Sequence, residues 1–278
     1  MLKGLTTAGL GKIGPTERFI ELAAQHGFQA VDIDAKSFLE QKGAEEAKSI
    51  LRRNGIVIGS VGLPVQWRTN DEEFRKGLAR LADYAAAAAE LGASRCCTYI
   101  LPSVDENPAH FMALATYRLR TCAQILHAYG IQLGLEFVGP HHLRTKWKHP
   151  FIWTMDQTLD WIDAIGMPNV GLLLDAYHWY TTESTVEDLL RLSPSQIVHV
   201  HINDAPNVPI EDVLDNDRLI TGEGVIDLVS FVRALHQIGY RGVVSQEVLR
   251  PAPPEEPAEE LLRRSQAGFE KVFSAALG

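Results

Sequence analysis

The segment GIQLGLEFV, residues 130–138, is a short apolar run with a carboxylate close to its end. Apolar runs of this length that begin or end at Gly, Pro, Asn or Asp are typical of β-strands. Successive side chains of a strand point to opposite faces, so Glu136 shares a face with Gln132 and Gly134. Burying a carboxylate is costly unless something pairs with it. The segment therefore predicts a strand whose last polar residue, Glu136, needs a partner.

Three later runs repeat this arrangement of a chelating side chain near the end of an apolar strand. They are NVGLLLDAYH (169–178), QIVHVHIND (196–204) and YRGVVSQEV (240–248). With the first run they supply four candidate metal ligands: Glu136, Asp175, His201 and Glu247. Any one of them alone also suits a hydrogen-bonded core residue. Four together favour one shared divalent cation.

Strand-like and helix-like segments alternate eight times along the 278 residues, with no linker or low-complexity tract between them. This rhythm predicts a (β/α)₈ TIM barrel formed as a single domain over residues 1–278. The other four predicted strands are KGLTTAG (3–9), FQAVDID (28–34), GIVIGSVGL (55–63) and ASRCCTYIL (93–101). A doubly wound open sheet is the alternative, weakened because no G-x-G-x-x-G turn follows the first strand.

The strand ends of such a barrel gather at one mouth, where catalytic groups of this fold lie. Three carboxylates and one imidazole form an oxygen-rich ligand set that favours Mn²⁺ or Co²⁺, while Mg²⁺ or Zn²⁺ also fit. The sequence therefore predicts one divalent cation at the barrel mouth.

Composition limits the partners of the chain. A net charge of −9 argues against a nucleic-acid-binding surface, which is built from clustered Lys and Arg. The three cysteines have no framework spacing and are expected to be reduced thiols. The N-terminus does not resemble a signal peptide, and no run of about 18 apolar residues occurs. We expect a cytoplasmic protein with no membrane or nucleic-acid partner, and a homo-oligomer is compatible with the sequence.

The motifs around the four ligands carry a family resemblance. These motifs are GLEFVG, NVGLLLDAYHWY, HVHINDA, DRLITGEGVIDL and VVSQEVLRP, between about residues 130 and 251. On them the chain resembles the sugar isomerase/epimerase superfamily of xylose-isomerase-like barrels, and within it inosose (2-keto-myo-inositol) isomerases. The resemblance implies that the four positions bind one metal. It also implies that His178 and Arg218 contact substrate oxygens, although an aromatic-cluster position for His178 and a surface ion pair for Arg218 are alternatives.

The ligand set suggests its chemistry. A metal held by two glutamates can chelate a carbonyl and the adjacent hydroxyl of a ketose, acidify the C–H bond between them and stabilise the enediolate. A glutamate that binds through one oxygen keeps the other free to move a proton. Glu136 and Glu247 are therefore the candidate acid/base pair.

Other polar residues receive weaker predictions. Trp67 follows the third strand and is a candidate for stacking on a sugar, with a core position as the alternative. The loop PHHLRTKWKHPFIW (140–153) departs from the inosose isomerase pattern, and its Lys148 is a candidate substrate contact. His199 is expected one layer deeper than His201. Asn203 and Asp204 are expected to orient His201.

Three reactions fit these residues. The first is isomerisation or epimerisation of a keto-sugar or inosose through an enediolate. The second is a lyase or dehydratase acting on a related keto-acid or 3-keto-glycoside. The third is phosphodiester hydrolysis of the endonuclease-IV type, which the missing extra histidines and the acidic charge disfavour. The sequence leaves open the substrate, the metal used and the oligomeric state.

Overall fold

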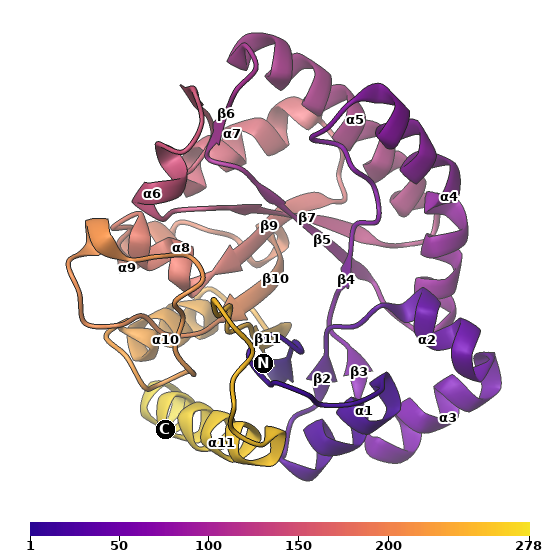
Figure 1. Ribbon diagram of the computed structural model, residues 1–278, viewed down its shortest axis with the longest axis vertical. Helices are drawn as coiled ribbons and strands as arrows, with labels where there is room; N and C mark the ends of the chain where they lie inside the picture. The colour runs from indigo at the N-terminus through magenta and orange to yellow at the C-terminus, as the bar shows by residue number, and fades with distance from the viewer.

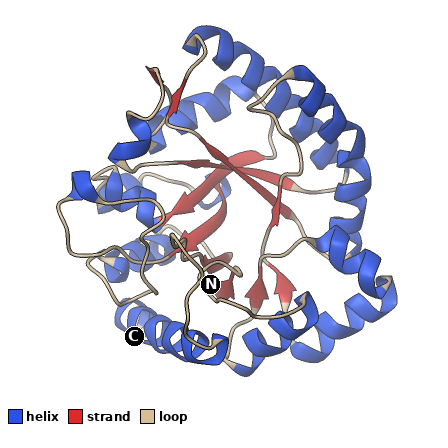
Figure 2. Ribbon diagram, viewed as in Figure 1, coloured by secondary structure: helices blue, strands red, loops and turns tan.

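Nine short parallel strands form the central sheet of the computed structural model, which covers residues 1–278. Their order is β3-β2-β1-β11-β10-β9-β7-β5-β4. A ring of helices encloses this sheet (Figures 1 and 2). The strands are β1 (Leu2–Leu5), β2 (Ala30–Val31), β3 (Val57–Ile58), β4 (Val61–Gly62), β5 (Arg95–Ile100), β7 (Gln132–Phe137), β9 (Val170–Asp175), β10 (Ile197–Ile202) and β11 (Val243–Gln246).

The third predicted strand closes the barrel because it is broken into two pieces. Its first piece, β3, pairs with β2, whereas its second piece, β4, pairs with β5. Only Gly59 and Ser60 separate the two pieces. The two ends of the sheet are thus consecutive in the chain, and eight strand positions surround one axis. The predicted (β/α)₈ fold is confirmed.

Two helices of the outer ring begin at side-chain caps that the sequence provides. Asn70 accepts a hydrogen bond from Glu73 N at the start of α4, and Thr154 forms a capping box with Gln157 at the start of α7. The ring contains α1 (Thr16–Gln25), α2 (Ala35–Lys42), α3 (Ala44–Asn54), α4 (Asp71–Glu90), α5 (Pro108–Ala128), α7 (Met155–Ile165), α9 (Val186–Leu190), α10 (Leu228–Gln237) and α11 (Ala258–Leu277). None of these helices combines the length and apolar character that crossing a membrane requires.

Several predicted strands are shorter in the structure, and the difference matters most after β9. The apolar run 169–178 predicts a strand throughout, but β9 ends at Asp175 and the short helix α8 (Ala176–Thr181) follows at once. The Asp175 side chain accepts a hydrogen bond from Tyr177 N, which caps α8. A capping carboxylate thus stops the strand where the candidate ligand stands.

The loop 140–153 contains secondary structure that the sequence did not reveal. It holds α6 (His141–Arg144) and β8 (His149–Pro150), and β8 pairs antiparallel with β6 (Ser103–Val104). This ribbon lies outside the barrel sheet, near α5 and α7 in Figure 1. Two single-turn 3₁₀ helices, Pro194–Gln196 and Ile210–Asp212, complete the structure.

Candidate metal centre

The four candidate ligands come from strands that are neighbours in the sheet. Glu136 and Asp175 lie on β7 and β9, His201 lies on β10, and Glu247 directly follows β11. The register pairs His201 with Asp175 and with Ser245. One ligand atom from each of the four residues lies within 4.8 Å of the others. The convergence predicted from the sequence is therefore present in the structure.

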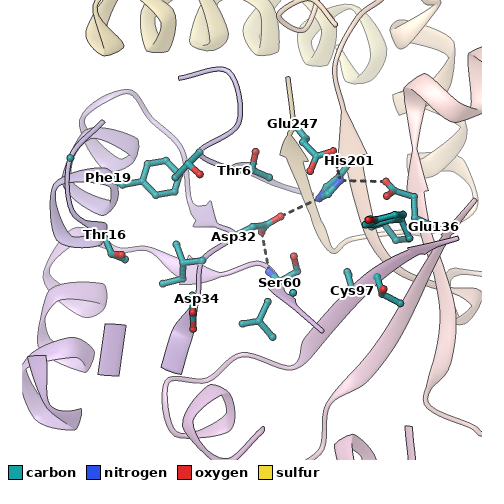
Figure 3. Close-up of a pocket in the computed structure, with 18 residues that line it drawn as sticks. Thr6, Thr16, Phe19, Asp32, Asp34, Ser60, Cys97, Glu136, His201 and Glu247 are labelled. Atoms are coloured by element: carbon teal, nitrogen blue, oxygen red, sulfur yellow. Dashed lines mark hydrogen bonds and ion pairs between the residues drawn. The ribbon is translucent and has the colours of Figure 1, made fainter. Parts of the chain in front are cut away.

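Two atoms that face the middle of this group, one from Glu136 and one from His201, lack a hydrogen-bond partner. His201 Nδ1 is 3.6 Å from Glu136 Oε1 and 3.5 Å from Glu247 Oε2, too far for hydrogen bonds. Glu136 Oε1 and His201 Nδ1 are both buried and have no hydrogen-bond partner. Figure 3 shows the three side chains pointing toward one another. Because a buried polar atom without a partner is costly, this donor set fits a divalent cation.

The other nitrogen of His201 contacts a residue that the sequence did not identify. Asp32, one residue beyond β2, places Oδ2 3.3 Å from His201 Nε2 and 2.8 Å from His199 Nε2. His199 precedes His201 by two residues on the same face of β10, one layer deeper in the barrel, and its side chain is fully buried. The sequence contained one signal for Asp32: it stands near the end of the predicted strand 28–34, as the four ligands do in theirs.

The predicted partners of His201 were wrong. Asn203 Nδ2 instead donates to Asp175 Oδ1 at 3.0 Å. Asp204 turns toward the following loop and accepts hydrogen bonds from the backbone N–H groups of Ala205, Gly222 and Ile226. Asn203 therefore orients Asp175 rather than His201. Asp204 stabilises the loop that follows β10 through these backbone hydrogen bonds.

Arg218 is buried against two of the candidate ligands. Its Nη1 donates to Asp175 Oδ2 at 2.7 Å and to Glu247 Oε2 at 3.1 Å, and its Nη2 donates to Asp215 Oδ1 at 2.8 Å. Its side chain is 2% exposed, which excludes the surface ion pair considered from the sequence. Burial opposes ionisation of Asp175, but Arg218, His178 and His201 hold its pKa at about 2.

His178 lies beside Arg218 rather than in the open pocket. Its Nδ1 accepts a hydrogen bond from Gly139 N at 3.2 Å, and its Nε2 is 3.4 Å from Arg218 Nη2. The side chain is 1% exposed. The structure thus brings together His178 and Arg218, the two residues that the resemblance assigned to the substrate. Their contact with a substrate stays a prediction.

The structure contradicts the sugar stacking predicted for Trp67. Trp67 is completely buried, donates from Nε1 to Thr98 Oγ1 at 3.0 Å and packs on Phe111 and Trp161, so no ring face is left for a sugar. Lys148 is exposed and is not among the residues that line the pocket, and its contact with a substrate stays a prediction. Alternation along a strand does not control the directions of side chains in the loops that follow.

A pocket of about 460 Å³ opens beside the candidate ligands (Figure 3). Glu136, His201 and Glu247 form one side, and the ends of β1 to β5 form the other. The remaining lining residues are Thr6, Thr7, Gly14, Thr16, Phe19, Asp32, Ile33, Asp34, Ser60, Val61, Gly62, Cys97, Thr98, Tyr99 and Leu173. Ten of the 18 lining residues carry a hydroxyl or a carboxylate, and none is Lys or Arg.

The charges around His201 predict how metal affinity depends on pH. Burial alone would lower the pKa of His201, but Glu247, Asp32 and Glu136 outweigh burial and raise it well above 6.5. A metal binds only the neutral imidazole, so the ion competes with this proton. We expect the affinity for Mn²⁺ to rise with pH through and beyond the ordinary histidine range. Calorimetric titration at several pH values measures this, and an affinity that is constant above pH 6.5 would contradict it.

Residues 20–267 match the model of the xylose isomerase-like TIM barrel family. The chain belongs to this family. The match covers most of the barrel, including all four candidate ligands, and it confirms the resemblance seen in the motifs.

Individual members of the xylose isomerase-like family are similar over most of the chain. Inosose isomerase of Bacillus velezensis is 27% identical over 265 residues, which cover 92% of this chain and 91% of that protein. Ketose 3-epimerase of Arthrobacter globiformis is 26% identical over 81% of this chain and 74% of its own. A solved xylose isomerase domain protein from Alicyclobacillus acidocaldarius is 35% identical over 100% of both chains, with a TM-score of 0.92. These names confirm the predicted enzyme class, a sugar isomerase or epimerase.

Proposed function

We propose that this protein is a divalent-metal-dependent isomerase or epimerase of an uncharged keto-sugar or inosose. The observation that carries the proposal is the convergence of Glu136, Asp175, His201 and Glu247 beside a pocket of hydroxyl and carboxylate groups. The relatives named inosose isomerase and ketose 3-epimerase support the substrate class. Mn²⁺ or Co²⁺ suits the ligand set best, and Mg²⁺ or Zn²⁺ is also compatible.

The four side chains would hold the cation and leave room for a substrate on the pocket side. A cation there would supply Lewis acidity to a carbonyl oxygen and the neighbouring hydroxyl, which acidifies the C–H bond between them. The proton itself has to be moved by the protein. Glu136 and Glu247 line the pocket, and each has a second carboxylate oxygen for this purpose.

The two glutamates differ in their affinity for a proton. Burial raises the pKa of Glu136 above its ordinary value. Burial also opposes ionisation of Glu247, but His201 and Arg218 more than offset it and lower the pKa of that group. Opposite shifts in a pair of carboxyls are characteristic of an acid and a base. The two glutamates are thus the candidate pair that removes the first proton and donates the second.

The pocket charge favours a neutral substrate. Four carboxylates line it and no Lys or Arg does, so a phosphate or carboxylate on the substrate would find no Lys or Arg there to pair with. The basic loop does not change this balance. Arg144, for example, bonds to the backbone oxygens of Gly139 and Thr181 and stacks over Trp153. The same argument opposes a keto-acid lyase and a phosphodiesterase, while a lyase acting on a neutral 3-keto-glycoside stays the alternative.

A deuterium-exchange screen tests the proposal. The Mn²⁺-loaded protein is incubated in D₂O with ketoses, inososes, 3-keto-glycosides and their phosphorylated or carboxylated counterparts. We expect deuterium at the carbon next to the carbonyl, in neutral compounds only, together with an isomer or epimer as product. A product that has lost a leaving group would identify a lyase. Equal turnover of an anionic counterpart would contradict the argument from pocket charge.

A further inference from the structure

Asp32 links the second strand of the barrel to the histidine of the candidate metal centre. Its side chain is 9% exposed, lines the pocket and contacts both His199 and His201. Figure 3 shows its contact with His201. Both Nε2 atoms approach the same oxygen, Oδ2, at 2.8 and 3.3 Å. A carboxylate oxygen can only accept, so both histidines donate from Nε2.

The second oxygen of Asp32 fixes the orientation of the carboxylate. Oδ1 accepts hydrogen bonds from Ser60 N at 3.0 Å and from Ser245 Oγ at 3.1 Å. A backbone N–H can only donate, so an acceptor has to stand at this position. Space is also reserved for it, because a Cβ added to Gly59 would overlap Asp32 Oδ1. The break between β3 and β4 thus provides both the donor and the room that Asp32 needs.

This arrangement determines which nitrogen of His201 is free. With its proton on Nε2, His201 presents the lone pair of Nδ1 toward Glu136 and Glu247. A metal ion needs that lone pair, and metal-bound imidazoles generally donate their other N–H to such a partner. We propose that Asp32 is a positioning residue that holds His201 in its metal-binding tautomer. The proposal rests on the metal site proposed above, and it assigns a role to a residue outside the ligand set.

Replacing Asp32 by asparagine separates this role from simple space filling. The amide oxygen has to face Ser60 N, so the amide NH₂ would take the place of Oδ2. It would donate to Nε2 of His199 and His201 and drive the proton of His201 to Nδ1, the atom required by the metal. An isosteric Asp-to-Asn exchange beside a histidine can impose the wrong tautomer in this way. Alanine removes the carboxylate but leaves His201 free to choose either tautomer.

The test is a metal titration of three proteins, each at a pH above which its affinity for Mn²⁺ no longer rises, so that His201 is neutral in all three. Wild type, Asp32→Asn and Asp32→Ala are titrated with Mn²⁺ by calorimetry, without substrate. We expect Asp32→Asn to weaken binding about 10- to 100-fold, the usual effect of losing such a partner, and Asp32→Ala to weaken it less. A space-filling role predicts the reverse order, because asparagine preserves the volume.

Two further measurements complete the test. Nitrogen NMR of the imidazoles reports the tautomer: we expect the His201 proton on Nε2 in wild type and on Nδ1 in Asp32→Asn. The control is Glu46→Gln on α3, which removes one exposed carboxylate that contacts Arg53 and lies outside the pocket. We expect it to leave the dissociation constant of Mn²⁺ unchanged.

The outcomes distinguish the two proposals. A wild-type protein that binds no metal would overturn the proposed function, and the role of Asp32 with it. Tight wild-type binding with an unaffected Asp32→Asn variant would overturn the positioning role alone. Two ions per wild-type chain, one of them lost in Asp32→Ala, would make Asp32 a ligand and also overturn it.

Discussion

Glu136→Gln and Glu247→Gln should each lower turnover by about 100- to 10,000-fold, the usual contribution of a positioned acid or base. Glutamine preserves the shape of the side chain and keeps an oxygen that can face a cation, but it cannot carry the transferred proton. The effect should therefore appear in kcat while metal is still bound. Turnover, metal content and deuterium incorporation are measured on the same samples.

The exchange measurement assigns the two roles. If turnover is lost but one variant still incorporates deuterium into its substrate, the glutamate that remains in that variant removes the first proton. The control is Glu46→Gln on α3, whose exposed carboxylate contacts only Arg53 at 3.1 Å, and we expect wild-type turnover from it. Wild-type turnover in either pocket variant, with metal bound, would show that the proton is moved by another group.

The ligand set could be predicted because it follows from one rule of the fold. Parallel strands of a barrel all end at the same mouth, so a chelating residue at the end of each strand converges with the others whatever their separation in sequence. Alternation of side chains then separates Glu136 and His201 from the apolar neighbours that face the helices. Neither step needs knowledge of a loop conformation.

Asp32 was missed because none of its partners is local. β2 is only two residues long, too short to show alternation, and His199 and Ser245 stand far away in sequence. The break of the third strand at Gly59 could not be predicted either, because the run 55–63 is apolar and has β-branched residues on both sides of that position. It becomes visible only once β2 and β5 are seen to pair with different halves of that strand.

The prediction for Trp67 failed for a related reason. Trp67 stands in a connection between elements, where no periodicity indicates the direction of a side chain. Trp67 lies against α5 and α7 through Phe111 and Trp161, and Arg118 Nη1 binds its backbone oxygen at 2.8 Å. A loop aromatic that is fixed on two sides in this way belongs to the core.

Arg218→Met should lower the free energy of unfolding by about 3–5 kcal/mol, the usual result of removing one partner from a buried ion pair. Asp175 has no exposed surface, and with Asp215 and Glu247 it would lose its cationic neighbour. Arg218→Lys should lose less, because it keeps a charge but not the planar fork that reaches three carboxylates. The matched control is Arg191→Met: that side chain is 61% exposed against Asp156 and Asp188, and its loss should cost at most about 1 kcal/mol.

Two conditions reveal whether charge is the cause of this loss. Arg218 helps to hold the pKa of Asp175 at about 2, below its usual 3.8, so the stabilisation is present above pH 3.8 and is lost as the pH falls toward 2. The difference in unfolding free energy between wild type and Arg218→Met should shrink over the same interval.

Saturating Mn²⁺ should also restore part of the stability that Arg218→Met loses, because a cation among the ligands replaces the charge next to Asp175 and Glu247. Denaturant unfolding measures both effects. A loss of stability in Arg218→Met that is independent of pH and metal would mean that Arg218 stabilises the barrel through packing rather than through its charge.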